Sequence, residues 1–246
     1  MIILLKKLLL LIVLKNVPDV APDALVEVSA LKIRIKFSKN DSVKFLGHLD
    51  IMRFFQRAFV RAGVKMLYSE GFNPHQKMSF AQPLGVGITS TGEYLDADVV
   101  DGQDLTEIKE NLDKACQGGF DILSVKELPL GVPNAMSAVK YASYSADFND
   151  NILPDLNGFM AQECILTNKK TKSGVKEIDI KPLIYKCELN GNTLHFIVSA
   201  GSENNIKPDL LLENLMSFLG LQYSRDMVKI TRRDLLGDNF IPLSDL

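Results

Sequence analysis

The sequence contains no tryptophan and only three cysteines, and these shortages argue against several kinds of protein. Cys116, Cys164 and Cys187 are widely spaced, so they match neither a disulfide framework nor a zinc site. A CxxxCxxC triplet is absent, which argues against a self-contained iron–sulfur cluster. We therefore expect no metal and no cofactor, and we expect free thiols in a reducing, cytoplasmic compartment.

Long apolar runs are also missing. The chain has no stretch of 18 or more apolar residues, so we expect no membrane span. Residues 1–14 (MIILLKKLLLLIVL) place two lysines before a seven-residue apolar run, which faintly resembles a secretory signal. A flexible or helical extension, or a mis-assigned upstream start, is the alternative. We leave residues 1–30 out of the predicted fold.

The remaining composition is that of an ordinary folded protein. Of the 246 residues, 46% are hydrophobic and 24% are charged, which suits one large domain or two small ones. Residues 31–80 hold ten Lys and Arg against three Asp and Glu, a net charge of +7. Residues 81–160 hold four against thirteen, a net charge of −9. The two segments either attract each other or form solvated surface, or the basic one attracts a phosphate-bearing partner.

The first half of the chain shows a mixed pattern of strands and helices. Residues 32–38 (KIRIKFS) alternate strictly, which predicts a half-buried strand with a basic outer face. One face carries Ile33, Ile35 and Phe37, and the other carries Lys32, Arg34 and Lys36. Helices are expected at 47–63 and 105–117, and strands at 78–88, 93–100 and 120–129. The order β-α-β-β-α-β is the ferredoxin-like pattern.

The second half repeats this order approximately. Strands are expected at 141–148 and 227–235 and on both sides of Asn190-Gly191, with helices at 155–162 and 207–220. Pro129, Gly131 and Pro133 interrupt the pattern between the halves. We predict an α+β fold with two ferredoxin-like (βαββαβ-type) lobes in tandem, at 31–133 and 134–246.

The helix at 47–63 carries a basic stripe. Arg53, Arg57 and Arg61 recur every four residues, so they lie beside the apolar face of the helix. We expect its phenylalanines (Phe54, Phe55 and Phe59) to belong to the core rather than to stack on bases. The stripe therefore offers guanidinium groups to an anion.

Residues 68–77 (YSEGFNPHQK) concentrate polar side chains around the turn signals Gly71 and Asn73-Pro74. The candidate acid–base groups are His48, Glu70 and His75. The candidate ligand-binding residues are Arg53, Arg57, Arg61, Tyr68, Asn73 and Lys77. The alternative is a turn without a chemical role, and the spacing of the histidines and carboxylates matches no known metal site.

Two segments, KFLGHLDIMRFFQRAFVRAG and YSEGFNPHQKMSFAQPLGVGITSTGEYLD, resemble the radical-SAM-associated family, a domain of unknown function. The resemblance is continuous over about 32–130, and EIDIKPLI, GSENNIKPDLLL and ITRRDLL extend it to about 237. Gln76 departs from the pattern, which has a second proline after Asn-Pro-His. The resemblance implies a companion of a radical SAM protein of the kind that carries a cobalamin-binding-type domain.

These observations favour a non-catalytic binding module over an enzyme. The module would bind RNA, or a radical SAM partner and its substrate, through the basic stripe and the 68–77 loop. The alternative is an RNA-processing or RNA-modifying enzyme that uses His48, Glu70 and His75 as acid–base groups.

Overall fold

A computed structural model describes residues 29–149, 152, 154–171, 174–202 and 204–246. The expectations for residues 1–28 lie outside this part of the chain. The strands are β1 (Ala30–Lys39), β2 (Met78–Phe80), β3 (Thr89–Val100), β4 (Ile122–Glu127), β5 (Tyr141–Phe148), β6 (Leu166–Thr171), β7 (Gly174–Asp179), β8 (Ile184–Asn190), β9 (Thr193–Ser199) and β10 (Val228–Leu236). The helices are α2 (His48–Arg61), α3 (Leu105–Cys116), α4 (Ala135–Ala138), α5 (Leu156–Ala161) and α6 (Pro208–Phe218). None of these helices is long and apolar enough to cross a bilayer.

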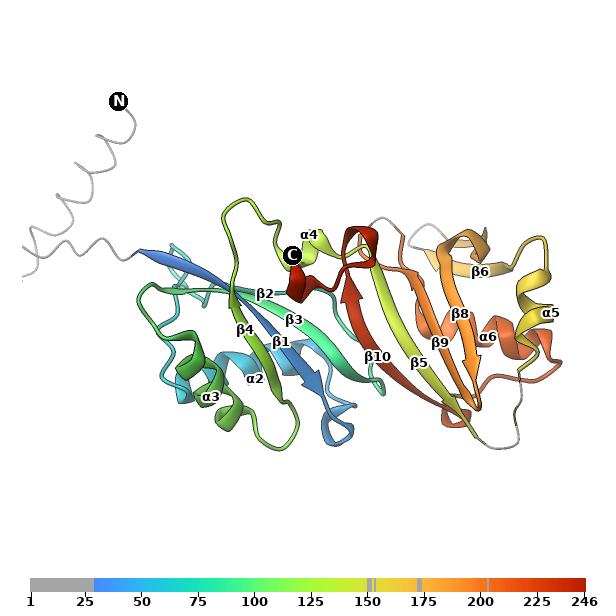
Figure 1. Cartoon of the computed structure of the whole chain (residues 1–246), viewed down its shortest axis with the longest axis horizontal. Helices are drawn as coiled ribbons and strands as arrows, with labels where there is room; N and C mark the ends of the chain where they lie inside the picture. Colours follow the sequence, from blue (N-terminus) through green and yellow to red (C-terminus); the bar gives the residue numbers. More distant parts are fainter. Residues whose placement is uncertain (1–28, 150–151, 153, 172–173, 203) are drawn as a thin grey trace, which may run out of the picture.

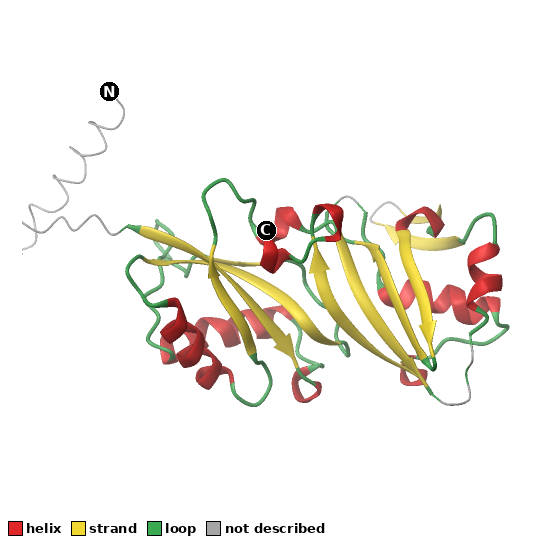
Figure 2. Cartoon of the chain, in the orientation of Figure 1, coloured by secondary structure: helices red, strands yellow, loops and turns green. Residues whose placement is uncertain are grey.

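The strands form one large mixed sheet, so the α+β class is confirmed (Figure 1, Figure 2). Its order is β4-β1-β3-β10-β5-β9-β8, with β2 on the edge of β3 and with β6 and β7 as a separate hairpin. Thr89 and Ser90 of β3 pair in parallel with Thr231 and Arg232 of β10 and thereby join the two halves. The predicted lobes are therefore not separate sheets. The two halves share one strand order when the strands are numbered along the chain within each half and the β6–β7 hairpin is left out. The order is fourth, first, third, second, which is β4-β1-β3-β2 in the first half and β10-β5-β9-β8 in the second.

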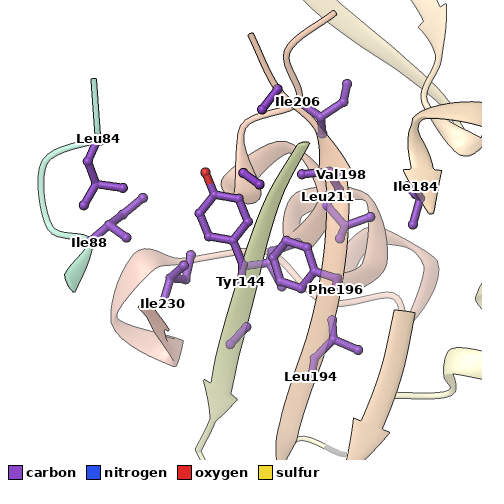
Figure 3. Packing of buried hydrophobic residues seen from close by; sticks show 14 of the residues in the cluster. Leu84, Ile88, Tyr144, Ile184, Leu194, Phe196, Val198, Ile206, Leu211 and Ile230 are labelled. Carbon is purple, nitrogen blue, oxygen red and sulfur yellow. The ribbon is translucent and has the colours of Figure 1, made fainter. Parts of the chain in front are cut away.

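The buried apolar residues form two cores, one within the first half and one that lies mostly in the second half but also includes Ala81, Leu84, Ile88 and Tyr94. In the first half, Ile33 and Ile35 of β1 pack with Phe55 of α2 and Leu112 of α3. In the second half, inward residues of β5 and β9, such as Tyr144 and Phe196, pack against α6 (Figure 3). The alternation predicted at 32–38 and 141–148 therefore sets which face of the sheet receives the helices.

The prediction that β1 has a basic, solvent-facing side is wrong at Arg34, the central residue of that side. Arg34 is only 3% exposed, because the segment after Pro133 and the C-terminal end of the chain lie over that face. Its guanidinium forms a bidentate pair with Asp96 at 2.8 and 3.0 Å and donates to the carbonyl oxygens of Leu243 and Pro133. Lys36 is also paired, with Asp234 at 2.7 Å. A strand pattern cannot reveal cover supplied by residues two hundred positions away.

A second buried ion pair lies where the halves meet. Arg232 of β10 is 1% exposed and binds Glu93 of β3 through its Nε atom, 2.7 Å from Oε1, and through a second contact. Burial alone lowers the pKa of Arg232, but the Glu93 carboxylate and Tyr144 more than offset this and raise it. The pair therefore neutralises one charge of each half where β10 meets β3.

Candidate functional site

Helix α2 presents the basic stripe to solvent. It begins at His48 after Gly47, and the chain leaves it through Gly63, whose φ of 69° suits glycine. Its inner face buries Ile51, Phe55, Ala58 and Phe59. Arg53, Arg57 and Arg61 are all exposed. Within the described residues, no carboxylate forms an ion pair with them.

The loop beside α2 is closed by backbone hydrogen bonds. The N–H of Ser69 donates to the His75 carbonyl oxygen, and the N–H of Lys77 donates to that of Leu67, each over 2.8 Å. Between these bonds Tyr68 faces Gln76 as an isolated antiparallel bridge. Ser69 Oγ also accepts from the N–H of His75 at 3.1 Å and lies 2.8 Å from His75 Nδ1. The imidazole orientation is therefore set by Ser69, which leaves Nε2 for another contact.

Gln76 attaches this loop to the helix. Its side chain is buried, and Nε2 donates to the carbonyl oxygen of Gln56 over 3.2 Å. Its Oε1 atom is buried and has no hydrogen-bond partner among the described protein atoms. A proline, the residue expected here from the resemblance, could not form this bond. Gln76 therefore gives the loop a direct connection to α2.

The helix and the loop enclose an open pocket of about 550 Å³, which we call the α2 groove. Helix α2 contributes Gln56, Arg57, Val60 and Arg61, and the loop contributes Tyr68, Pro74, His75 and Gln76. Tyr68 is half exposed, and Val60 is also exposed, so the groove offers apolar surface beside two guanidinium groups. Arg61 is partly held, because it donates to the Ala115 carbonyl oxygen at 2.8 Å and lies over the ring of Phe54 at 5.6 Å.

The predicted site residues do not all meet. Arg57, Arg61, Tyr68 and His75 line the α2 groove, whereas His48 lies at the opposite end of α2. Nine residues of helix place His48 about 13 Å along the axis from Arg57. Its ring packs on the edge of Phe80 at 5.4 Å.

The remaining candidates surround the groove without lining it. Arg53, Glu70, Asn73 and Lys77 are exposed. In the described part of the chain, no hydrogen bond or ion pair joins Glu70 to His48 or His75. Nor does that part hold a group of three or more His, Cys, Asp or Glu placed for a metal ion.

Sequence reasoning missed three features of the site. Ser69 is not among the predicted site residues, although a Ser beside a turn commonly bonds a nearby backbone N–H, and this is the signal that the sequence offers. Gln76 was recognised only as a departure from the family pattern. Phe72 is fully exposed at the tip of the loop, so this region carries two accessible rings, Tyr68 and Phe72, besides the core phenylalanines. Of the three phenylalanines predicted to be core, Phe55 and Phe59 are fully buried and Phe54 is partly buried against them.

Comparison with known proteins gives one family match. A family model described as "Uncharacterized protein conserved in bacteria (DUF2344)" matches residues 32–208, a span that includes α2 and its loop. None of the curated proteins matches the chain. A solved structure titled "Crystal Structure of an Unknown Protein from Galdieria sulphuraria" is 14% identical over 83% of this chain and 98% of that chain, with a TM-score of 0.28. So low a score carries no argument about fold or function.

Proposed function

The chain belongs to the DUF2344 family of uncharacterised proteins conserved in bacteria, and from this premise we propose that it is a non-catalytic module that binds single-stranded RNA in the α2 groove. The observation that carries the proposal is that Arg57, Arg61 and the half-exposed Tyr68 line one pocket. Single-stranded nucleic acid is bound by this combination of basic groups for the backbone and aromatic faces for the bases.

The charges of the groove suit a phosphate backbone. Arg57 has no paired carboxylate among the described residues, so its guanidinium can bind phosphate without first breaking an ion pair. Arg53 continues the stripe one helical turn before it. His75 lies on the opposite wall of the groove. Its Nδ1 atom contacts Ser69 Oγ, so Nε2 is the ring nitrogen that can bind the RNA.

The apolar part of the groove suits a base. Tyr68 contributes an exposed ring, and Val60 contributes exposed methyl groups on the facing helix. Stacking of one base on an aromatic side chain stabilises binding by about 1–3 kcal/mol, whatever the base. We therefore expect affinity for single strands with little sequence preference.

The proposed module has two ferredoxin-like lobes, at 31–133 and 134–246. The shared strand order of the two halves supports this division. The resemblance to the radical-SAM-associated family suggests that the module works beside a radical SAM protein and presents RNA to it. That partner is the second part of the proposal.

An enzymatic role remains a second candidate. The observation that favours it is the 2.8 Å contact between Ser69 Oγ and His75 Nδ1, which orients the imidazole at the wall of the groove. This role predicts turnover of RNA that His75→Ala abolishes while the fold survives.

Fluorescence anisotropy with a labelled single-stranded RNA of mixed sequence tests the proposed function. We expect binding that weakens as salt rises, and loss of binding in the variant with Arg53, Arg57 and Arg61 all changed to Glu. The control with the same change in net charge has Lys176, Lys207 and Lys229 all changed to Glu; these positions are exposed and lie outside the groove. No binding by the folded wild-type chain, or equal losses in the variant and the control, would contradict the proposal.

A further inference from the structure

A second group of exposed rings lies in the other half of the chain, away from the α2 groove. Tyr141 of β5, Tyr185 of β8 and Phe240 form a compact cluster. The centroid of Tyr141 lies 4.7 Å from that of Tyr185 and 4.4 Å from that of Phe240. Tyr185 and Phe240 are each more than two-fifths exposed, so the cluster is open to solvent.

The cluster lies on the face of the sheet that α6 does not cover. On β5 the alternate residues Ala142, Tyr144 and Ala146 belong to the core beneath α6, so Tyr141 projects to the other face. In Figure 1, β8 and β9 pass in front of α6, so this view shows the face of the sheet that α6 does not cover. Exposed rings on the open face of a four-stranded sheet can stack unpaired bases.

The backbone holds Phe240 in an uncommon conformation. Phe240 has a φ of 60°, and Asn239 before it has a φ of 55°. A bulky side chain in this left-handed region costs about 1–2 kcal/mol. The conformation places the Phe240 ring against Tyr141. Strain of this order persists at sites where the surrounding structure imposes it, and such sites are frequently functional.

A pocket adjoins the rings. It has a volume of about 160 Å³, and Lys140, Tyr141, Tyr185 and Ser199 are among the residues that line it. A cavity of about 150 Å³ accommodates one benzene ring, so this pocket has room for one planar ring. The hydroxyl groups of Tyr185 and Ser199 lie 3.0 Å apart and supply polar contacts for a ring with heteroatoms.

The charge of this pocket favours an anionic ligand. Among the described residues that line it, Lys140 alone carries a charge; it is exposed and has no ion pair within the part of the chain that the structure describes. A planar heteroatom ring with an attached anion is the chemistry of a nucleotide. A peptide aromatic side chain would fill the space but would leave Lys140 without a counter-charge.

We propose that this ring pocket binds one unstacked pyrimidine nucleotide of a single RNA strand, with its base beside Tyr141 and Tyr185 and its phosphate on Lys140. The choice of RNA as the source of the nucleotide rests on the proposed function. The geometry of the pocket does not depend on the α2 groove.

Ultraviolet crosslinking of the full chain to an oligouridylate, followed by peptide mapping, tests this inference. We expect crosslinks at Tyr141, Tyr185 or Phe240 as well as at Tyr68. Tyr185→Ala and, separately, Lys140→Glu should each lower the ring-pocket crosslinks at least about fivefold and leave those at Tyr68 unchanged. Arg57→Glu should do the reverse.

The outcomes separate the two proposals. Crosslinks at Tyr68 alone overturn the ring pocket and leave the α2 groove supported. Crosslinks in the ring pocket alone overturn the groove and support the pocket. Displacement of the ring-pocket crosslinks by an equal concentration of free uridine monophosphate overturns the assignment to an RNA strand, because the free nucleotide is then the ligand.

Discussion

Gln76 Nε2 donates a hydrogen bond to the carbonyl oxygen of Gln56 over 3.2 Å, so a loop residue is bonded directly to the helix that carries the basic stripe. Two backbone bonds, from Ser69 and Lys77, close the base of the same loop. The positions of Tyr68 and His75 relative to Arg57 are thus fixed by contacts from both the backbone and a side chain. Backbone and side-chain hydrogen bonds therefore hold the loop wall of the α2 groove in place.

Replacing Gln76 by Met tests how the loop is held. The variant loses one hydrogen bond, worth about 0.5–1.5 kcal/mol, but it also removes a buried Oε1 atom without a described partner, which costs a similar amount. We expect the free energy of unfolding in urea to change by less than about 1 kcal/mol. A loss above about 3 kcal/mol would show that the Gln76–Gln56 bond, and not the backbone pairing, holds the loop.

Tyr68→Ala tests the stacking surface. The side chain is half exposed, so its removal leaves the core intact and stability should change little. We expect the affinity for single-stranded RNA to fall about 5- to 150-fold, which corresponds to one lost base stack. Tyr68→Phe keeps the ring and should retain most of the affinity. Equal losses in both variants would assign the effect to the hydroxyl group instead.

The ion pair between the halves predicts a large effect on stability. Arg232→Met leaves the Glu93 carboxylate buried without its partner, so we expect a loss of about 3–5 kcal/mol in chemical denaturation. The double variant Arg232→Met with Glu93→Leu removes both charges and should recover most of this loss. A double variant no more stable than Arg232→Met would contradict this account of the junction.

The three thiols should differ in reactivity. Burial, which exceeds every other influence, raises the pKa of Cys116 to about 12 and that of Cys187 to about 12, whereas Cys164 is exposed. At pH 8 a thiol with a pKa of 12 has about a thousandfold less thiolate than one with a pKa of 9. Iodoacetamide should therefore modify Cys164 first in the folded chain, and the other two only after unfolding. Modification of all three at equal rates without denaturant would contradict the raised pKa values of Cys116 and Cys187.

Cys116 and Cys187 should also make the folded chain less stable at alkaline pH. In the folded chain Cys116 and Cys187 keep their protons to a higher pH than in the unfolded chain, because their pKa values are raised. Their contribution to the free energy of unfolding is therefore complete below about pH 9 and is lost progressively between about pH 9 and pH 12. Replacing both by Ala should flatten that part of the pH profile measured by urea denaturation.

The local elements follow closely from the sequence. The strand expected at 141–148 is observed as Tyr141–Phe148, and the helix expected at 105–117 as Leu105–Cys116, because alternation and helical periodicity decide both. Asn190-Gly191 marks the hairpin between β8 and β9 as predicted. By contrast, the strand expected at 78–88 is limited to Met78–Phe80, because Pro83 and the glycines that follow interrupt it.

The long-range features could not be predicted in the same way. The pairing of β3 with β10 involves two residues on each strand, separated by about 140 positions, and no sequence period records it. The burial of Arg34 depends on the C-terminal residues around Leu243. The sequence shows that Tyr68 is a polar aromatic residue, but its exposure depends on where the loop lies against α2.

The most direct test of the central claim is the salt dependence of RNA binding by the wild-type chain, Arg57→Gln and Lys176→Gln. The logarithm of the association constant falls linearly with the logarithm of salt concentration, by about 0.7 for each phosphate contact on a single strand. If Arg57 binds a phosphate in the α2 groove, the slope for Arg57→Gln will be shallower by about 0.7, and the slope for Lys176→Gln will match the wild type. Equal slopes for all three proteins would show that RNA does not contact Arg57, and the α2 groove would no longer be its binding site.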